Sequence, residues 1–453
     1  MASVWSLRIH SKHFIMNKTP IAIFWHRRDI RIHDNAGLYH ALKSGLPVLS
    51  LFIFDTNILD KLEDKTDKRV LFIHRELTEL DAQLQQLGTS LLVKVGSPEL
   101  VWKELLKTLD VKTVFTNHDF EPYAKERDAA IGQLFAAKDI ALNTYKDHVV
   151  FEKNEVLKDD GKPYTVFTPY SRKWRERLKP FHFKSYPNEK YFGNYYPTSA
   201  FEIPSLHSFG FEESDFTFPE RIVKADIVSK YSQQRDIPSI KGTSHLGIHL
   251  RFGTLSIRKL LAYSLKKNQT FVNELIWRDF YQTILWHFPH VAVRSFRAEY
   301  DRIQWENDET FFQKWCDGKT GYPLVDAGMR ELNETGYMHN RVRMVVASFL
   351  TKHLLIDWRL GEAYFAAKLL DFDLAANNGG WQWAAGSGTD AAPYFRVFNP
   401  TLQAQKFDPK SIYIKKWVPE FGTPDYPAPI VEHNVARKKV LEVYGRVLKA
   451  EKQ

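Results

Sequence analysis

A segment in the second half of the chain, residues 273–281 (NELIWRDFY), combines residue types that could hold a flat, polar ligand. Its polar and aromatic side chains recur with helical spacing and so share one stripe of a helix: Glu274, Trp277, Arg278 and Tyr281. A carboxylate and a guanidinium can hydrogen-bond such a ligand, and aromatic rings can stack on it. The same spacing fits an ordinary Glu–Arg pair on a helix surface, and the residues alone favour neither interpretation.

A second segment, residues 336–344 (GYMHNRVRM), places polar side chains at the entry to an apolar helical run. They are His339, Asn340, Arg341 and Arg343. Polar groups that enter such a helix need partners, because unpaired burial is costly. Arginine can pair with phosphate and asparagine can read a base edge, so the segment suits a nucleotide or nucleic-acid ligand.

A third segment, residues 370–383 (LDFDLAANNGGWQW), is dense in aspartate, asparagine, glycine and tryptophan. This composition is poor material for a plain core. Small residues such as glycine also let a ligand approach the backbone closely. We therefore interpret this segment as part of a binding site.

The common catalytic and phosphate-binding templates are absent from the sequence. There is no GxSxG, no HExxH, and no GxGxxG or GxxxxGK[ST] at a strand–helix junction. The single cysteine, Cys316, lies in a helix-like stretch and is interpreted as a packing residue. His245 and His249 come nearest to a metal-ligand pair, but the sequence predicts no metal site.

These segments must be held by two kinds of architecture. Short apolar runs at residues 21–25, 47–54, 90–95 and 113–116 alternate with helix-like stretches at 69–87 and 98–109. Continuous apolar strands separated by helices indicate a parallel sheet, so residues 18–145 are predicted to form a Rossmann-like α/β domain. Residues 1–17 are predicted to lie outside the fold, with Met16 as the natural start.

The rest of the chain reads as a connector followed by helices. Residues 146–215 are rich in proline and aromatic residues and are predicted to form a connector with little regular structure. Residues 216–453 show apolar residues at helical spacing and are predicted to form a larger all-α domain. The clearest helical stretches are 257–265, 274–287, 336–355 and 361–370.

Composition narrows the class of protein. The 453 residues are 44% hydrophobic and 26% charged, which excludes wholesale disorder, and the lone cysteine excludes a disulfide framework. No apolar run is long enough to span a bilayer, so a cytoplasmic protein is expected. A net charge of +9 and an aromatic content of 14% suit a partner that is a polyanion with flat rings, although a basic protein with a large core fits composition alone better.

These motifs, in this order, resemble the photolyase/cryptochrome family. The resemblance begins at residues 24–35 (FWHRRDIRIHDN), runs to about residue 435, and is strongest in residues 318–332 and the three segments above. The sequence is most similar to the bacterial class I photolyases that repair cyclobutane pyrimidine dimers. This resemblance implies an α/β antenna domain and a helical domain that binds FAD.

The resemblance assigns residues to the cofactor. FAD contacts are expected at Tyr231, Thr243, Ser244, His245, Leu246, Gly247, Phe271, Arg278, Arg343, Asp371, Asp373 and Asn377. In the family, an amide at the position of Asn377 favours the fully reduced, anionic flavin. Trp381, Trp358 and Trp305 match an electron-transfer chain from the flavin to the surface.

It also assigns residues to damaged DNA. Glu274 is expected to hydrogen-bond the dimer, Trp277 and Trp383 to sandwich it, and Asn340 and Met344 to line the pocket floor. Contacts with the surrounding DNA are expected at Arg235, Arg341, Arg396 and Gln403. The implied reaction is light-driven electron transfer from reduced FAD to a dimer swung out of the helix, as in other base-flipping enzymes.

Several alternatives stay open. The protein could be a cryptochrome-like blue-light sensor or a photolyase specific for (6-4) photoproducts, although Asn340 stands where (6-4) enzymes carry a histidine. A nucleotide-binding enzyme acting on RNA is weaker still. Tyr123 and Ala124 replace the Asn-Glu pair typical of folate antennas, so a deazaflavin, a second flavin or no antenna chromophore is expected. No obligate protein partner is evident, and a monomer is expected.

Overall fold

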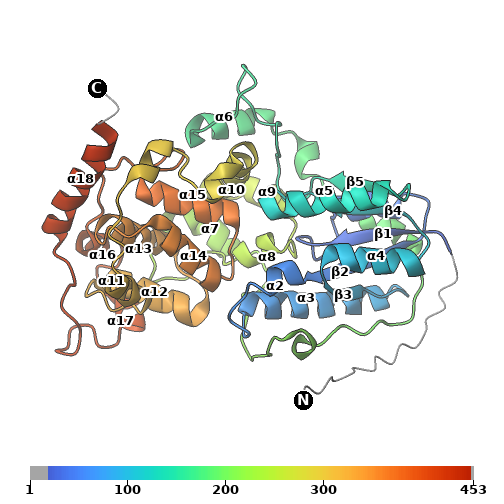
Figure 1. Ribbon diagram of the computed structural model, residues 1–453, viewed down its shortest axis with the longest axis horizontal. Helices are drawn as coiled ribbons and strands as arrows, with labels where there is room; N and C mark the ends of the chain where they lie inside the picture. Colours follow the sequence, from blue (N-terminus) through green and yellow to red (C-terminus); the bar gives the residue numbers. More distant parts are fainter. Residues whose placement is uncertain (1–18, 450–453) are drawn as a thin grey trace, which may run out of the picture.

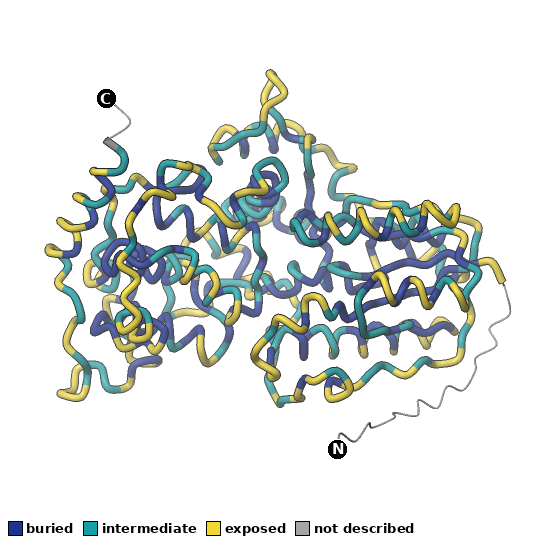
Figure 2. The backbone as a smooth tube through the Cα atoms, viewed as in Figure 1, coloured by how far each residue is buried: buried dark blue, intermediate teal, exposed yellow. Residues whose placement is uncertain are grey.

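The computed structural model describes residues 19–449 and begins with a five-stranded parallel sheet (Figure 1). The strands are β1 (Ile21–His26), β2 (Val48–Asp55), β3 (Leu92–Gly96), β4 (Val111–Asn117) and β5 (Ala141–Tyr145), in the order β3-β2-β1-β4-β5. Every residue of β1 and β2 is buried, as their continuous apolar sequences require when helices cover both faces of a sheet (Figure 2). The predicted α/β fold is confirmed, while the predicted N-terminal extension falls outside the described residues.

The helices of this domain are α1 (Ala36–Leu42), α2 (Thr56–Leu59), α3 (Lys68–Gln85), α4 (Pro98–Thr108) and α5 (Pro122–Ala136). The ends of the four predicted strands and of the two predicted helices agree with the observed ends to within two residues. Strand β5 was not predicted, because its sequence ALNTY contains no buried residue and so lacks the apolar run that reveals the others.

The segment after the sheet contains a regular helix, which corrects the prediction of a connector with little regular structure. Helix α6 (Phe167–Arg177) lies against α10 (Gln269–His287) and buries Tyr170 and Trp174. Its many basic residues and the proline in its first turn hide the helical pattern in the sequence. Short 3-10 turns follow it at Pro180–Phe183, Asn188–Asn194 and Leu206–Phe209. The domain boundaries at residues 145 and 215 remain predictions.

The regular elements after residue 215 are all helices, as predicted, within the residues that the structure describes (Figure 1). Besides α10, the helices are α7 (Ala225–Gln234), α8 (Gly247–Arg251), α9 (Ile257–Leu265), α11 (Glu309–Cys316), α12 (Pro323–Thr335), α13 (Asn340–Lys352), α14 (Trp358–Lys368), α15 (Leu374–Ala385), α16 (Pro400–Phe407), α17 (Ile412–Trp417) and α18 (His433–Lys449), with 3-10 turns at Pro289–Ala292 and Ala298–Arg302. The helix predicted from residue 336 begins at Asn340 instead. Gly336 ends α12 with a left-handed φ of 66°, and His339 caps α13.

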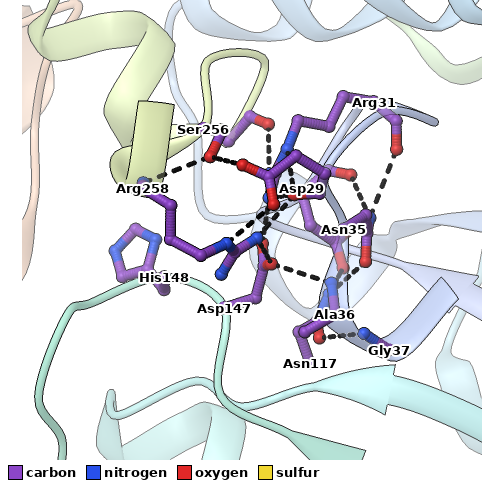
Figure 3. A network of polar contacts seen from close by, with 12 residues as sticks. Asp29, Arg31, Asn35, Ala36, Gly37, Asn117, Asp147, His148, Ser256 and Arg258 are labelled. Atoms are coloured by element: carbon purple, nitrogen blue, oxygen red, sulfur yellow. Dashed lines mark hydrogen bonds and ion pairs between the residues drawn. The ribbon is translucent and has the colours of Figure 1, made fainter. Parts of the chain in front are cut away.

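Buried ion pairs join the loop after β1 to the helical domain (Figure 3). The guanidinium groups of Arg31 and Arg258 each donate to the Asp147 carboxylate at 2.6 Å. Burial alone would raise the pKa of Asp147, but the two cations outweigh it and lower that pKa to about 2. Loss of one partner would leave a buried charge unpaired, so this network fixes the sheet against the helices.

Candidate functional site

A cavity of about 460 Å³ opens between α10, α13 and α15, and the three segments singled out in the sequence meet in its walls. This is within the size range of pockets that bind small molecules and cofactors. The predicted site residues that line it are Arg235, Gly247, Glu274, Trp277, Arg278, Asn340, Arg343, Met344, Asp371, Asp373, Asn377, Trp381 and Trp383.

One wall of the cavity is an arginine–aspartate pair. Arg343 on α13 donates through Nη2 to both carboxylate oxygens of Asp371, at 3.0 and 3.2 Å, and through Nε to the Met338 carbonyl at 2.7 Å. Burial acts to lower the pKa of Arg343, but the Asp371 carboxylate outweighs it and raises that pKa. Gly247 closes against this pair, since a Cβ there would lie 2.8 Å from Asp371.

A second wall is tied to the α/β domain. Arg28, in the loop after β1, forms a short ion pair with Asp373 and also contacts Asp119 and Glu121 at 3.1 Å. Burial works to raise the pKa of Asp373, but the neighbouring Arg28 holds it well below its usual range. Arg278 donates to the His148 carbonyl at 2.6 Å, and its burial lowers its pKa to about 10. The loop after β1 therefore helps to shape the cavity.

Two of the arginines that are predicted to contact DNA are paired with carboxylates. Arg235 forms a short ion pair with Glu274, and Arg341 donates to Asp236 at 2.7 Å. Burial raises the pKa of Glu274, although Arg235 opposes the shift. The sequence indicated Arg235, Arg341 and Glu274 as separate contacts, whereas the structure places Arg235 directly on Glu274. Asp236 was missed, although it adjoins Arg235.

Two tryptophans and one amide complete the lining. Trp277 on α10 and Trp383 on α15 both line the cavity. The Asn377 side-chain amide donates to Glu362 Oε1 at 2.8 Å and to the Glu362 carbonyl at 3.1 Å, so its orientation is fixed from α14. Burial raises the pKa of Glu362. The sequence did not indicate Glu362, because nothing in the α14 pattern distinguishes it from a surface residue.

The three tryptophans of the predicted electron-transfer chain differ in burial. Trp381 lines the cavity and is 2% exposed, Trp358 at the start of α14 is equally buried, and Trp305 is partly exposed. The Trp381 ring packs against α14, since a Cβ on Gly361 would come within 2.2 Å of it. Trp305 packs against the Tyr444 ring at 6.1 Å. Trp305 is thus the most exposed of the three, and the chain itself stays a prediction.

The other predicted cofactor and DNA contacts do not line the cavity. Residues 243–246 precede Gly247, and their loop is held by Tyr337, whose hydroxyl lies 3.0 Å from the Thr243 hydroxyl and whose ring stacks on His245 at 4.0 Å. His245 has a left-handed φ of 53°. The set outside the lining is Tyr231, Thr243, Ser244, His245, Leu246, Phe271, Arg341, Arg396 and Gln403.

His339 makes the start of α13 sensitive to acid. Its Nδ1 accepts a hydrogen bond from the Arg341 N–H at 3.2 Å, which requires a neutral ring. Burial and, after it, Arg343 lower the pKa of His339 from 6.5 to about 4. A lowered histidine pKa contributes stability that is complete above pH 6.5 and is lost as the pH falls through 4.

We expect His339→Asn to shift the acid-unfolding midpoint of the protein to lower pH, because asparagine caps a helix without titrating. The midpoint is measured by circular dichroism between neutral pH and pH values near 3. His290→Asn, on the exposed 3-10 turn, serves as the control and should leave the midpoint unchanged. An unaltered midpoint in His339→Asn would show that this cap does not contribute to acid sensitivity.

The residues around the cavity suit a flavin dinucleotide. Its walls are apolar where a ring system needs contact, at Trp381, Phe365 and Ala347, and they carry fixed charges at Arg278 and Arg343 that a polar, anionic ligand needs. Fold and cavity together define a two-domain protein in which an α/β sheet supports a helical, nucleotide-binding domain.

Comparisons with known proteins give the family. The family model described as DNA photolyase matches residues 22–189, and that described as the FAD binding domain of DNA photolyase matches residues 271–424. The deoxyribodipyrimidine photo-lyase of Synechococcus sp. is 37% identical over 94% of this chain and 96% of its own length. The chain therefore belongs to the DNA photolyase family, and its predicted membership is confirmed.

Solved structures of photolyases have the same fold as this chain. A class III photolyase from Agrobacterium tumefaciens superposes with a TM-score of 0.83 and 31% identity, covering 97% of this chain and 100% of its own. An archaeal photolyase from Sulfolobus tokodaii, solved with two FAD molecules, gives a TM-score of 0.79 and 34% identity over 94% of this chain and 99% of its own. Similarity to a class III enzyme leaves the assignment to class I a prediction.

Proposed function

We propose that this protein repairs cyclobutane pyrimidine dimers in DNA, using light and reduced FAD. The observation that carries the proposal is one cavity whose lining combines apolar residues, fixed charges and three tryptophans: Trp277, Trp381 and Trp383. Relatives that share about a third of its sequence over nearly the whole chain are deoxyribodipyrimidine photo-lyases.

The cofactor is FAD, held by α8, α10, α13 and α15. When bound and reduced, FAD supplies the photoexcited electron that opens the cyclobutane ring. Arg343 and Asp371 form a fixed charged pair that would hold the flavin, and Glu362 accepts from the Asn377 amide and so fixes its orientation. Tyr337 braces the loop at Thr243–Gly247, whose hydroxyls and backbone N–H groups would bind the phosphates.

The same cavity would also receive the lesion. Trp277 and Trp383 provide ring faces for the two bases, and Glu274 provides a carboxylate to hydrogen-bond them. Asn340 and Met344 line the same cavity and would contact the lesion. Arg235 in the lining, and Arg341, Arg396 and Gln403 outside it, would contact the flanking DNA. A dimer stacks poorly in the duplex, so swinging it out costs less than swinging out intact bases.

We further propose that the protein acts as a cytoplasmic monomer with no obligate protein partner. Among residues 19–449, no helix has the length and apolar character that crossing a membrane requires. DNA is the partner that its net charge of +9 favours, and affinity should fall as salt rises because phosphate contacts release counterions.

The antenna chromophore stays open. Tyr123, at the position of the family's folate-binding pair, donates its hydroxyl to Asp55 at 2.6 Å, and Ala124 is buried. A folate is therefore unsupported, and a deazaflavin or a second flavin is the alternative. The second FAD of the Sulfolobus tokodaii photolyase is a precedent in that protein for the latter.

The competing functions are a blue-light sensor and repair of (6-4) photoproducts. The test is to illuminate the reduced holoprotein with blue light on two oligonucleotides, one with a cyclobutane dimer and one with a (6-4) photoproduct, and to resolve the products by chromatography. Intact thymines from the first substrate alone are expected. Repair of neither would favour the sensor, and repair of the second would reassign the lesion.

A further inference from the structure

A phenylalanine stacks behind the tryptophan that we place against the lesion. The rings of Phe167 and Trp277 lie face to face, with centroids 3.7 Å apart and planes inclined by 3°. Phe167 is the first residue of α6, in the segment between the two domains. Trp277 lines the cavity, so Phe167 supports the indole from outside it.

Helix α6 is fixed firmly to the helix that carries Trp277. The Trp174 indole N–H donates to Asp279 Oδ2 at 2.9 Å, and this carboxylate also accepts from the Phe151 N–H at 3.1 Å. Arg175 donates to the Asn273 side chain at 2.8 Å. These contacts bracket Trp277 along α10, so α6 cannot slide without breaking buried hydrogen bonds.

The backbone of Phe167 is hydrogen-bonded to the loop after α15. The backbone N–H of Phe167 donates to Asp390 Oδ2 at 3.3 Å. Asp390 lies seven residues beyond Trp383 in the chain, in the loop that leads to Arg396. Phe167 therefore joins one cavity tryptophan to the segment that follows the other.

We propose that Phe167 is a positioning residue for lesion binding, which it serves by holding the Trp277 ring in the orientation that receives a base. This inference rests on the proposed function. A tryptophan held in one rotamer loses less conformational freedom when a base stacks on it, and the stack leaves one indole face for the ligand. Phe167 itself does not line the cavity.

The test compares Phe167→Leu, which removes the ring, with Phe167→Tyr, which keeps it. The readout is the dissociation constant for an oligonucleotide with a cyclobutane dimer, and for its undamaged counterpart, measured on FAD-loaded protein in the dark. Phe167→Leu should weaken dimer binding roughly three- to tenfold, as expected for one side chain that must be immobilised, without changing affinity for undamaged DNA. Phe167→Tyr should keep the wild-type dissociation constant for the dimer.

Two controls separate positioning from a loss of structure. Phe181→Leu removes a phenylalanine that is 67% exposed in the same connecting segment and should change nothing. If Phe167→Leu does not yield folded protein, Phe167→Met replaces it, because methionine keeps the volume and lacks the flat ring. Bound FAD, read from its absorption, should equal that of the wild type in every variant.

A double-mutant cycle with Trp277→Ala tests whether Phe167 acts through Trp277. In that background Phe167→Leu should have no further effect, because the side chain that it positions is gone. An equal loss in both backgrounds, or unchanged dimer affinity in Phe167→Leu beside a weakened Trp277→Ala, would overturn the inference and leave the proposed function standing. Equal affinity of the wild type for damaged and undamaged DNA would instead overturn the proposed function.

Discussion

Trp277→Ala is expected to weaken binding of dimer-containing DNA by about 1–3 kcal/mol, the free energy that one aromatic–base stack contributes. The indole lines the cavity mouth on α10, three residues after Glu274, and its other face is covered by Phe167. Alanine keeps the helix but offers no ring face to the base. The measurement is a fluorescence-anisotropy titration of a labelled oligonucleotide in the dark.

The matched control is Trp286→Ala, which removes a second tryptophan from the same helix. Trp286 lies outside the cavity lining, where Lys125 contacts its ring face at 4.3 Å. It should leave affinity for the dimer unaltered, and neither variant should change binding to undamaged DNA. Wild-type affinity in Trp277→Ala would remove the stacking role that we assign to this residue.

Trp381→Phe is expected to slow light-driven reduction of oxidised flavin by about tenfold or more, since even a 1.4 kcal/mol higher barrier costs a factor of ten. An indole is oxidised far more readily than a phenyl ring, and Trp381 is the member of the predicted chain that lines the cavity. Repair by flavin that was reduced chemically beforehand should proceed normally, because that reaction does not draw on the chain.

Trp315→Phe provides the comparison for this variant. Trp315 is fully buried and its ring lies 6.1 Å from that of Trp381, but it does not line the cavity. Photoreduction is followed by the loss of oxidised-flavin absorption under blue light with a thiol donor. Normal photoreduction in Trp381→Phe, or an equal loss in both variants, would contradict the assigned chain.

The pattern of apolar residues predicted the strands that are completely buried. The strands β1 and β2 are buried along their whole length and read as continuous apolar runs, so the sequence indicates them directly. Strand β5 at the sheet edge has no buried residue, and helix α6 is basic and proline-containing, so neither carries that signal. Their positions depend on tertiary contacts, such as the Trp174–Asp279 hydrogen bond.

The candidate site was predictable in its composition but not in its pairings. Residues such as Glu274, Asp371 and Asn377 fall in motifs whose order is specific to the family. Their partners come from elsewhere in the chain: Arg235 pairs with Glu274 and Glu362 accepts from Asn377. Spacing along one helix cannot reveal a contact between two elements far apart in sequence, and Arg28 shows this most clearly, because it reaches Asp373 from the first strand's loop.

The central claim is that one cavity holds the flavin and the lesion close enough for an electron to pass between them. The most direct test is the fluorescence lifetime of the reduced flavin, measured with saturating dimer-containing oligonucleotide and with its undamaged counterpart. The dimer alone should shorten the lifetime. If the dimer is bound at saturation and the lifetime stays at the value found with undamaged DNA, the flavin and the lesion do not share the cavity.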